Sequence, residues 1–301
     1  MKTNKILVSA FAFSLAFASF TSCSSDSGSS LPPIGGYNNS DEVAASSQKA
    51  YWPLDGNGKE EVSNTSPTST VATTYVDGIK GQAASFNYGY MAYPAITALN
   101  TTSGSASISV WVKVSNNKAN PAAVSTTSPI FSLTRTGEAF GNLNLMAETH
   151  GLTTSDSIQM KGVFRIKKPD GTEFGGDAVN MIKQEAWMDA THTWAANKIG
   201  GQWAHVVYVY DGPTATNRIY VNGVKISNSA WEVRNGGDPF PLNHFLPTRP
   251  VIGALETVVN GTNLDTWNAA LKGQVDELRV YDKTLTTAEI GALYGLGLEG
   301  R

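Results

Sequence analysis

Residues 201–212 read GQWAHVVYVYDG, and this stretch decides the fold. Its segment Trp203–Tyr210 is rich in aromatic and β-branched residues, which fit a pleated, half-buried strand. The segment Asp211–Pro213 follows with the turn chemistry that ends a strand. The stretch therefore predicts a long strand that stops at a defined turn.

A tight hairpin comes next in the chain. The segments Arg218–Val221 and Val224–Ile226 flank the dipeptide Asn222-Gly223. This dipeptide suits a two-residue type I′ turn, because both central residues of that turn need a positive φ. A long strand followed by such a hairpin predicts the middle of an antiparallel sheet.

Three further patterns stand near the ends of the folded part. Residues 50–58 read AYWPLDGNG, residues 76–86 read VDGIKGQAASF and residues 271–282 read LKGQVDELRVYD. With the central strand and its YVNG hairpin, these patterns resemble the laminin G-like domains of the concanavalin A-like jelly rolls, from Ala50 to Tyr294. The resemblance implies an all-β fold, an antiparallel jelly-roll β-sandwich with a short C-terminal helix.

The C-terminal helix has its own local signals. Thr286 and Glu289 have the spacing of a capping box, in which each side chain bonds to the backbone of the other. Leu285 and Ile290 stand at the positions of a hydrophobic staple. Gly295 is expected to stop the helix.

The N-terminus has the pattern of an export signal. Lys2 and Lys5 precede an apolar segment, Ile6–Phe20, that is too short for a comfortable membrane span. Small residues and then Cys23 follow. The arrangement resembles a bacterial lipoprotein signal, whose cysteine is acylated after cleavage. An ordinary secretory signal with an incidental cysteine is the alternative.

We therefore expect a signal peptide over residues 1–22, a flexible tether over 23–48 and one laminin G-like domain over 49–301. The tether is rich in Ser, Gly, Asn and Pro, and it lacks the apolar surface needed to order itself. The expected location is the outer membrane of a diderm bacterium, facing the periplasm or the cell surface. Contact with the membrane would be through the lipid anchor only.

Composition excludes several classes of function. The charged fraction is 16% and the net charge is −3, so no basic surface for nucleic acid is expected. A single cysteine excludes an internal disulfide framework and a thiolate-rich zinc site.

Local catalytic motifs are absent from the sequence. Glucanases of this fold class place paired acids two or four residues apart on one strand, where one attacks and the other donates a proton. No such run occurs, and the adjacent Asp276 and Glu277 would point to opposite faces of their strand. The family often has His two residues after Trp, so His205 is expected to pack within the fold. We predict that the protein is not an enzyme.

Asp276 alternates with Leu278 and Val280, which predicts that its carboxylate is on the buried face. A buried carboxylate needs a partner. Related jelly rolls often hold one structural calcium ion with an Asp of the last strand and oxygens near the first strand. By that resemblance, Asp55 and Asn57 are candidate metal ligands together with Asp276. Plain hydrogen bonding of Asp276 is the alternative.

Two stretches, Asp177–Lys198 and Ser229–Thr248, depart from the family pattern and are interpreted as insertions at one end of the sandwich. They hold aromatic residues beside polar side chains, the combination that sugar recognition uses, although a loop tryptophan can equally pack an insertion onto the sandwich. The candidate ligand-binding residues are Trp187, His192, Trp194, Trp231, Arg234 and Asp238.

These observations predict a lipid-anchored, lectin-like protein of the cell envelope that binds a polysaccharide or oligosaccharide and serves glycan capture. Laminin G-like domains also bind proteins, so an adhesion module is one alternative. A glycan-cleaving enzyme is another, because catalytic groups can converge from distant loops.

Overall fold

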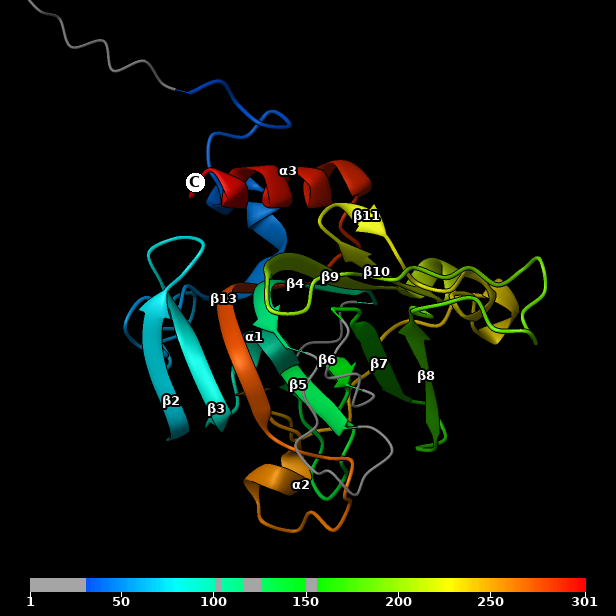
Figure 1. The fold of residues 1–301 in the computed structure, drawn as a ribbon. Coiled ribbons are helices and arrows are strands. Elements are labelled where there is room, and N and C mark those ends of the chain that lie inside the picture. The colour runs from blue at the N-terminus through cyan, green and yellow to red at the C-terminus, as the bar shows by residue number, and fades with distance from the viewer. Residues whose placement is uncertain (1–30, 101–103, 116–125, 150–155) are drawn as a thin grey trace, which may run out of the picture. The chain divides into compact units, whose positions relative to one another are not determined.

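Thirteen β-strands form one antiparallel sheet in a computed structural model that describes residues 31–100, 104–115, 126–149 and 156–301 (Figure 1). The strands are β1 (Gln48–Trp52), β2 (Ser69–Asp77), β3 (Gln82–Ala92), β4 (Ala106–Val114), β5 (Thr126–Leu133), β6 (Leu143–Thr149), β7 (Gln159–Lys167), β8 (Glu173–Val179), β9 (Trp203–Asp211), β10 (Thr216–Val221), β11 (Val224–Lys225), β12 (Pro250–Ile252) and β13 (Leu271–Tyr281). The helices are α1 (Thr97–Asn100), α2 (Glu256–Val259) and α3 (Thr287–Leu298). Short 3-10 helices occur at Ser40–Glu42, Ala45–Ser47, Gly212–Thr214, Ser229–Trp231 and Asn235–Gly237.

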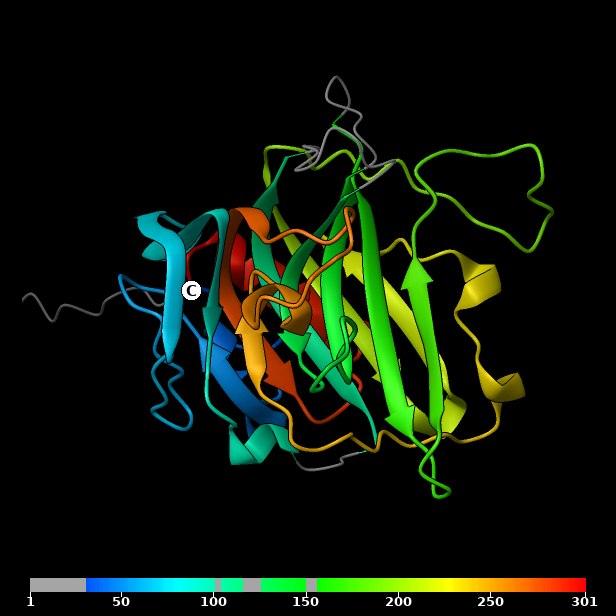
Figure 2. The ribbon, with the colours of Figure 1, turned by 90° about the horizontal axis from the view of Figure 1, so that it is seen from below.

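The sheet curls until its two halves face each other. Its strand order is β11-β10-β9-β4-β13-β3-β12-β5-β6-β7-β8, with β1 added on β13 and β2 on β3. Strands β9, β4 and β13 form one layer and strands β5 to β8 the other (Figures 1 and 2). The main hydrophobic core lies between the layers. The predicted all-β jelly-roll sandwich is confirmed.

Aromatic residues join the two layers. The rings of Phe164 on β7 and Tyr210 on β9 have centroids 4.5 Å apart. Gly162 on β7 makes room for the neighbouring ring, because a Cβ at this position would lie 2.2 Å from the ring of Tyr208. The central strand is therefore the inner wall of the core, as its composition predicted.

The predicted hairpin is present. Strands β10 and β11 pair through Val221 and Val224, and between them Asn222 and Gly223 have φ values of 50° and 78°. Both values are positive, as a type I′ turn requires.

Helix α3 covers the outer face of β4 and β9 (Figure 1). The capping box of Thr286 and Glu289 is formed, but the predicted stop at Gly295 is wrong, because the helix continues to Leu298. Gly295 and Gly297 serve close packing instead. A Cβ on Gly297 would lie 2.4 Å from Nε1 of Trp111.

Residues 33–47, which belong to the expected tether, pack against the C-terminal part of the chain. The backbone N–H of Ser40 donates to the carbonyl of Arg301 at 3.3 Å, and Nε of Arg301 donates to the carbonyl of Asn38 at 2.9 Å. A Cβ on Gly295 would lie 2.9 Å from the side chain of Ile34. The chain divides into residues 1–32 and a body of residues 33–301, so this body includes the second half of the expected tether. The expected signal peptide and Cys23 lie outside the described residues.

Strand β13 contains a bulge that alters one prediction. The register with β4 shifts between Asp276 and Arg279, and Glu277 has a φ of 51°. An extra residue in one strand reverses the alternation beyond it. Leu278 faces the main core while Asp276 points to the other side, where it is buried by a turn. The prediction that Asp276 shares a face with Leu278 and Val280 is therefore wrong, although the carboxylate is buried.

Candidate functional site

The two insertions meet beside strand β8. The backbone N–H of Thr193, in the first insertion, donates to Oδ1 of Asn228 at 3.1 Å. The N–H of Ser229, in the second, donates to Oγ1 of Thr193 at 3.0 Å. The first insertion also begins within regular structure, because Asp177–Val179 belong to β8. Two segments far apart in the sequence thus build one surface.

Three of the candidate residues form an aromatic cluster on this surface. The indole rings of Trp187 and Trp231 stack with centroids 6.2 Å apart. The ring of His192 meets Trp187 edge-on at 5.2 Å and Trp231 at 5.9 Å. Nδ1 of His192 lies 2.8 Å from Oδ1 of Asp189, which orients the imidazole. Trp187 is 57% exposed, so the cluster presents a ring to solvent.

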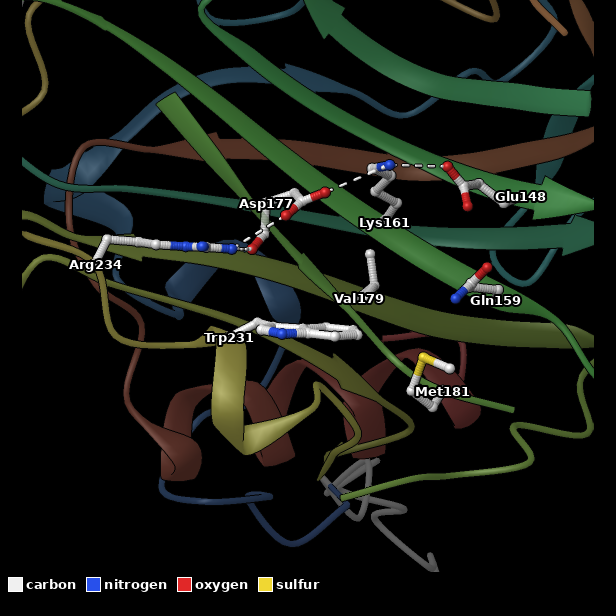
Figure 3. A pocket seen from close by; sticks show the side chains of 8 residues that line it. All are labelled: Glu148, Gln159, Lys161, Asp177, Val179, Met181, Trp231 and Arg234. Atoms are coloured by element: carbon white, nitrogen blue, oxygen red, sulfur yellow. Dashed lines mark hydrogen bonds and ion pairs between the residues drawn. The ribbon is translucent and has the colours of Figure 1, made fainter. Parts of the chain in front are cut away.

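A pocket of about 380 Å³ lies next to the cluster (Figure 3). Strands β6, β7 and β8 supply its floor and the second insertion supplies one wall. Its lining residues are Glu148, Gln159, Lys161, Asp177, Val179, Met181, Trp231 and Arg234. The pocket therefore combines one indole ring with amide, carboxylate, ammonium and guanidinium groups.

The charged side chains of the pocket are paired in a row. Nζ of Lys161 lies 3.0 Å from Oε1 of Glu148 and 3.4 Å from Oδ2 of Asp177. Nη2 of Arg234 lies 3.1 Å from Oδ1 of Asp177 and also donates to the backbone carbonyl of that residue (Figure 3). Burial opposes the charge of Lys161, but the two carboxylates outweigh burial and raise the pKa of its amine. The two positive and the two negative side-chain charges of the pocket therefore cancel.

Four of the six predicted ligand-binding residues do not line the pocket. Trp187 and His192 belong to the aromatic cluster beside it, whereas Trp194 and Asp238 belong to neither. The side chain of Trp194 is 51% exposed and lines no part of it, although the Trp194 backbone forms a bridge with Met181. Asp238 is exposed, and its backbone is tied to that of Asn235. The aromatic cluster therefore contains two of the three candidate tryptophans, Trp187 and Trp231.

Sequence reasoning missed the floor of the pocket. Gln159 and Lys161 occupy alternate positions of β7, on the side opposite Met160. A lysine inside a strand with buried neighbours was the available signal. The positions of Glu148 and Asp177 beside it depend on the pairing of β6 and β8 with β7, which no local pattern encodes.

Two of the three metal candidates, Asp276 and Asp55, contact one turn. The backbone N–H groups of Ile79 and Lys80 donate to Oδ2 of Asp276 at 2.7 and 3.1 Å, and the N–H of Gln82 donates to Oδ1 of Asp55 at 2.6 Å. Within the described part of the chain, Oδ1 of Asp276 is buried without a hydrogen-bond partner. Burial raises the pKa of Asp276 to about 7, against the backbone amides that lower it.

These groups fit a calcium ion in part. The unpartnered oxygen of Asp276 suits a hard cation, and the side chain of Asp55 contacts the same turn. Oδ1 of Asn57, however, accepts from the N–H of Lys59 at 2.8 Å. The described residues contain no cluster of three or more His, Cys, Asp or Glu side chains that could hold a metal.

His205 has a structural environment. It is buried, and its Nε2 lies 2.8 Å from Oγ of Ser109. Its ring also lies 5.3 Å from that of Trp111, beneath α3. Burial, with a smaller contribution from Arg279, lowers the pKa of His205 to about 3, so the imidazole is neutral at physiological pH.

Comparison with known families decides the classification. A laminin G family model, described as the concanavalin A-like lectin/glucanases superfamily, matches residues 85–291. The chain belongs to this superfamily. The superfamily name covers both lectins and glucanases, so membership is compatible with binding and with cleavage.

Solved structures share the fold of this superfamily member at low sequence identity. The binding domain of Paraclostridial Mosquitocidal Protein 1 has a TM-score of 0.53 and 14% identity, over 83% of this chain and 52% of that one. The ligand-binding domain of botulinum neurotoxin serotype D, in complex with N-acetylneuraminic acid, has a TM-score of 0.50 and 12% identity. The match covers 84% of this chain and 52% of that one. The matched region thus spans about half the length of each of these chains.

A comparison with curated proteins found no match for this superfamily member. Among the described residues, no helix has the length and apolar character needed to cross a membrane.

Proposed function

We propose that this protein binds a glycan in the pocket beside Trp231. The observation that supports this most directly is the position of the Trp231 indole beside planar polar groups, Arg234 among them, with the exposed Trp187 extending the aromatic surface. An indole face stacks on the C–H face of a sugar ring, and the surrounding amide and charged groups bond to its hydroxyls.

The balance of charge favours a neutral glycan. Lys161 and Arg234 are compensated by Glu148 and Asp177 within the pocket. A ligand with a net charge would have to break one of these pairs or sit beside it unpaired, and unpaired charge near a protein surface is unfavourable. Sugar hydroxyls can both donate to and accept from paired groups, so they leave the pairs intact.

Binding without cleavage is the function that this arrangement supports. Glycoside hydrolysis uses two carboxyl groups that face the scissile bond from opposite sides. In this pocket the amine of Lys161 stands between Glu148 and Asp177, in contact with both. The related toxin domain bound to N-acetylneuraminic acid is also a ligand-binding domain, which agrees with this proposal at the level of the fold.

The experiment is a retention assay on immobilised neutral polysaccharides, with the soluble fraction analysed for released sugars. We expect retention on at least one polysaccharide and no release of oligosaccharides. Released oligosaccharides would show that the protein is a glycan-cleaving enzyme. Retention of a partner protein with no retention on any polysaccharide would favour an adhesion module.

We further propose that the protein is a lipoprotein acylated at Cys23 and located in the outer membrane. The support is the sequence alone: a basic start, a short apolar segment, two small residues and then the single cysteine.

A structural calcium ion is the third proposal. Asp276 and Asp55 would hold it beside the turn that both already contact. When bound, the ion would supply positive charge to the buried Asp276 carboxylate. Ile79, Lys80 and Gln82 hold the turn in place through their backbone N–H groups.

A further inference from the structure

A second pocket lies on the outer face of the other layer of the sandwich. It has a volume of about 410 Å³ and is formed where β3, β13 and β4 run side by side. Its lining residues are Ser85, Phe86, Asn87, Lys113, Ser115, Lys272, Gly273 and Gln274. We call it the lysine pocket.

The strand register places both lysines of this pocket on one face. Gln274 on β13 pairs with Lys113 on β4 and with Ser85 on β3, and Lys272 pairs with Asn87. Residues two apart on a strand share a face, so these five side chains point the same way. Lys113 and Lys272 are diagonal neighbours, whose Cα atoms are about 7–8 Å apart in an antiparallel pair. One ligand group can therefore reach both amines.

The lysine pocket differs from the first pocket in its charge. None of its lining residues is acidic. In the part of the chain that the structure describes, neither Lys113 nor Lys272 forms an ion pair, whereas Lys161 and Arg234 in the first pocket are both paired. The protein as a whole has a net charge of −3, whereas this pocket carries two positive charges without an acidic partner.

An exposed aromatic ring stands at the edge of this pocket. Nζ of Lys272 lies 5.3 Å from the centroid of the Tyr88 ring. Tyr88 is 40% exposed and has a φ of 56°, an uncommon conformation for a residue with a side chain. The Tyr88 phenol ring thus lies beside the amine of Lys272.

We propose that the lysine pocket is a second binding site, for an acidic sugar unit whose carboxylate or sulfate group lies between Lys113 and Lys272. The amide groups of Gln274 and Asn87 and the hydroxyl of Ser85 then bond to sugar hydroxyls, and Tyr88 offers a face for the ring. A polar hollow fits a sugar better than it fits a membrane surface, which binds flat basic or apolar faces. This site is independent of the proposed neutral-glycan pocket, because different residues on the other face form it.

The test uses the full chain and two matched probes, an oligogalacturonate and the same oligomer with its carboxyl groups reduced to alcohols. Dextran sulfate and uncharged dextran form a second pair, which distinguishes sulfate from carboxylate as the recognised group. Binding is measured by titration calorimetry at low and at moderate salt. We expect the acidic member of at least one pair to bind, its reduced or uncharged partner not to bind, and the affinity to fall with salt.

Variants locate the site. Lys113→Gln and Lys272→Gln should each weaken binding of the acidic probe about fivefold, the value of one exposed ion pair, and the double variant should weaken it about twentyfold or more. Lys167→Gln is the matched control, because it removes the same charge from an exposed position at the end of β7. It should leave the affinity unchanged, and so should Trp231→Ala.

Three results would overturn the inference. One is equal binding of an acidic probe and its uncharged partner. Another is an equal loss of affinity in Lys167→Gln and the two pocket variants, which would mean that only net charge matters. The last is lysine-dependent binding to phosphatidylglycerol vesicles without binding to either acidic glycan, which would assign the pocket to a membrane surface. If Trp231→Ala no longer binds neutral polysaccharide but still binds the acidic probe, the two sites are independent.

Discussion

The indole rings of Trp187 and Trp231 stack within 23° of parallel, although they come from two insertions separated by the central strand β9 and the hairpin that follows it. This relationship joins the two insertions, and Trp231, one of the two rings, lines the first pocket.

The pairing of Arg234 with Asp177 should matter more for binding than for folding. Both side chains are partly exposed, so Arg234→Gln should lower the free energy of unfolding by about 1 kcal/mol or less. It removes the guanidinium donors from the pocket lining and leaves Asp177 with one cation partner in place of two, so the affinity for the glycan should fall several-fold.

The matched control is Arg218→Gln, which removes an arginine that contacts Glu232 at 3.6 Å outside the pocket. Calorimetric titration with a retained polysaccharide compares the two variants. An equal effect of both on affinity would contradict the role given to Arg234.

Most of the fold could be predicted from the sequence because its signals are local. The Asn222-Gly223 turn and the capping box of Thr286 and Glu289 each depend on residues within a few positions of one another. The bulge at Glu277 is different, since one inserted residue reverses the faces beyond it without a mark in the alternation. This is why the face of Asp276 was predicted incorrectly.

The site was predicted only in part, because local patterns mark its loop residues but not the strand pairing that forms its floor. Trp187 and Trp231 were identifiable as polar-loop tryptophans, but Trp194, with the same composition around it, points elsewhere. The partners of Lys161 lie on two other strands and become neighbours only through the register of β6, β7 and β8. Such long-range pairing is not written in any one segment.

The glycines of α3 give a direct test of its packing. Gly297→Ala places a Cβ 2.4 Å from the Trp111 ring and should lower the free energy of unfolding by about 1–3 kcal/mol, the usual cost of overpacking. A Cβ on Gly291 would meet no packing neighbour within 4 Å, so Gly291→Ala should raise stability by about 0.5–1 kcal/mol. Denaturant unfolding measures both, and the same sign for the two variants would refute this packing.

The buried carboxylate of Asp276 should make stability depend on pH. Its pKa is raised to about 7 from 3.8, so between about pH 4 and pH 7 the folded state holds a proton that the unfolded state has lost. Stability should therefore fall as pH rises through this window, by about 1.4 kcal/mol per pH unit for this one group. The difference in unfolding free energy between the wild type and Asp276→Asn isolates that slope, and a constant difference would show that the group does not titrate there.

Calcium should act on the same carboxylate. The ion favours the ionised form, so at pH 7 added calcium should raise the melting temperature and a chelator should lower it. Asp276→Asn should abolish the response to both. A wild-type melting temperature that ignores calcium and chelator alike would leave Asp276 with its two backbone N–H donors and no metal.

The proposed anchor predicts a change in fractionation. Cys23→Ala should leave the signal uncleaved or release the protein from the membrane fraction, because several acyl chains are needed for stable anchoring. Fractionation and mass spectrometry of the N-terminal peptide measure this, with Ser24→Ala as the control. Unchanged processing and membrane association in Cys23→Ala would show that the protein is not a lipoprotein acylated at Cys23.

The most direct test of the glycan site is calorimetric titration of a retained neutral polysaccharide into the wild type, Trp231→Ala and Trp267→Ala, with a melting curve for each. Trp267 stacks on Phe140 outside the pocket and controls for loss of an indole. Truncation of a stacking ring should cost about 1–3 kcal/mol of binding free energy. Trp231→Ala should therefore bind roughly ten- to hundredfold more weakly, with little change in melting temperature. Trp267→Ala should melt lower and bind normally when folded. Wild-type affinity in Trp231→Ala, or a loss that only follows its folded fraction, would contradict the proposed function.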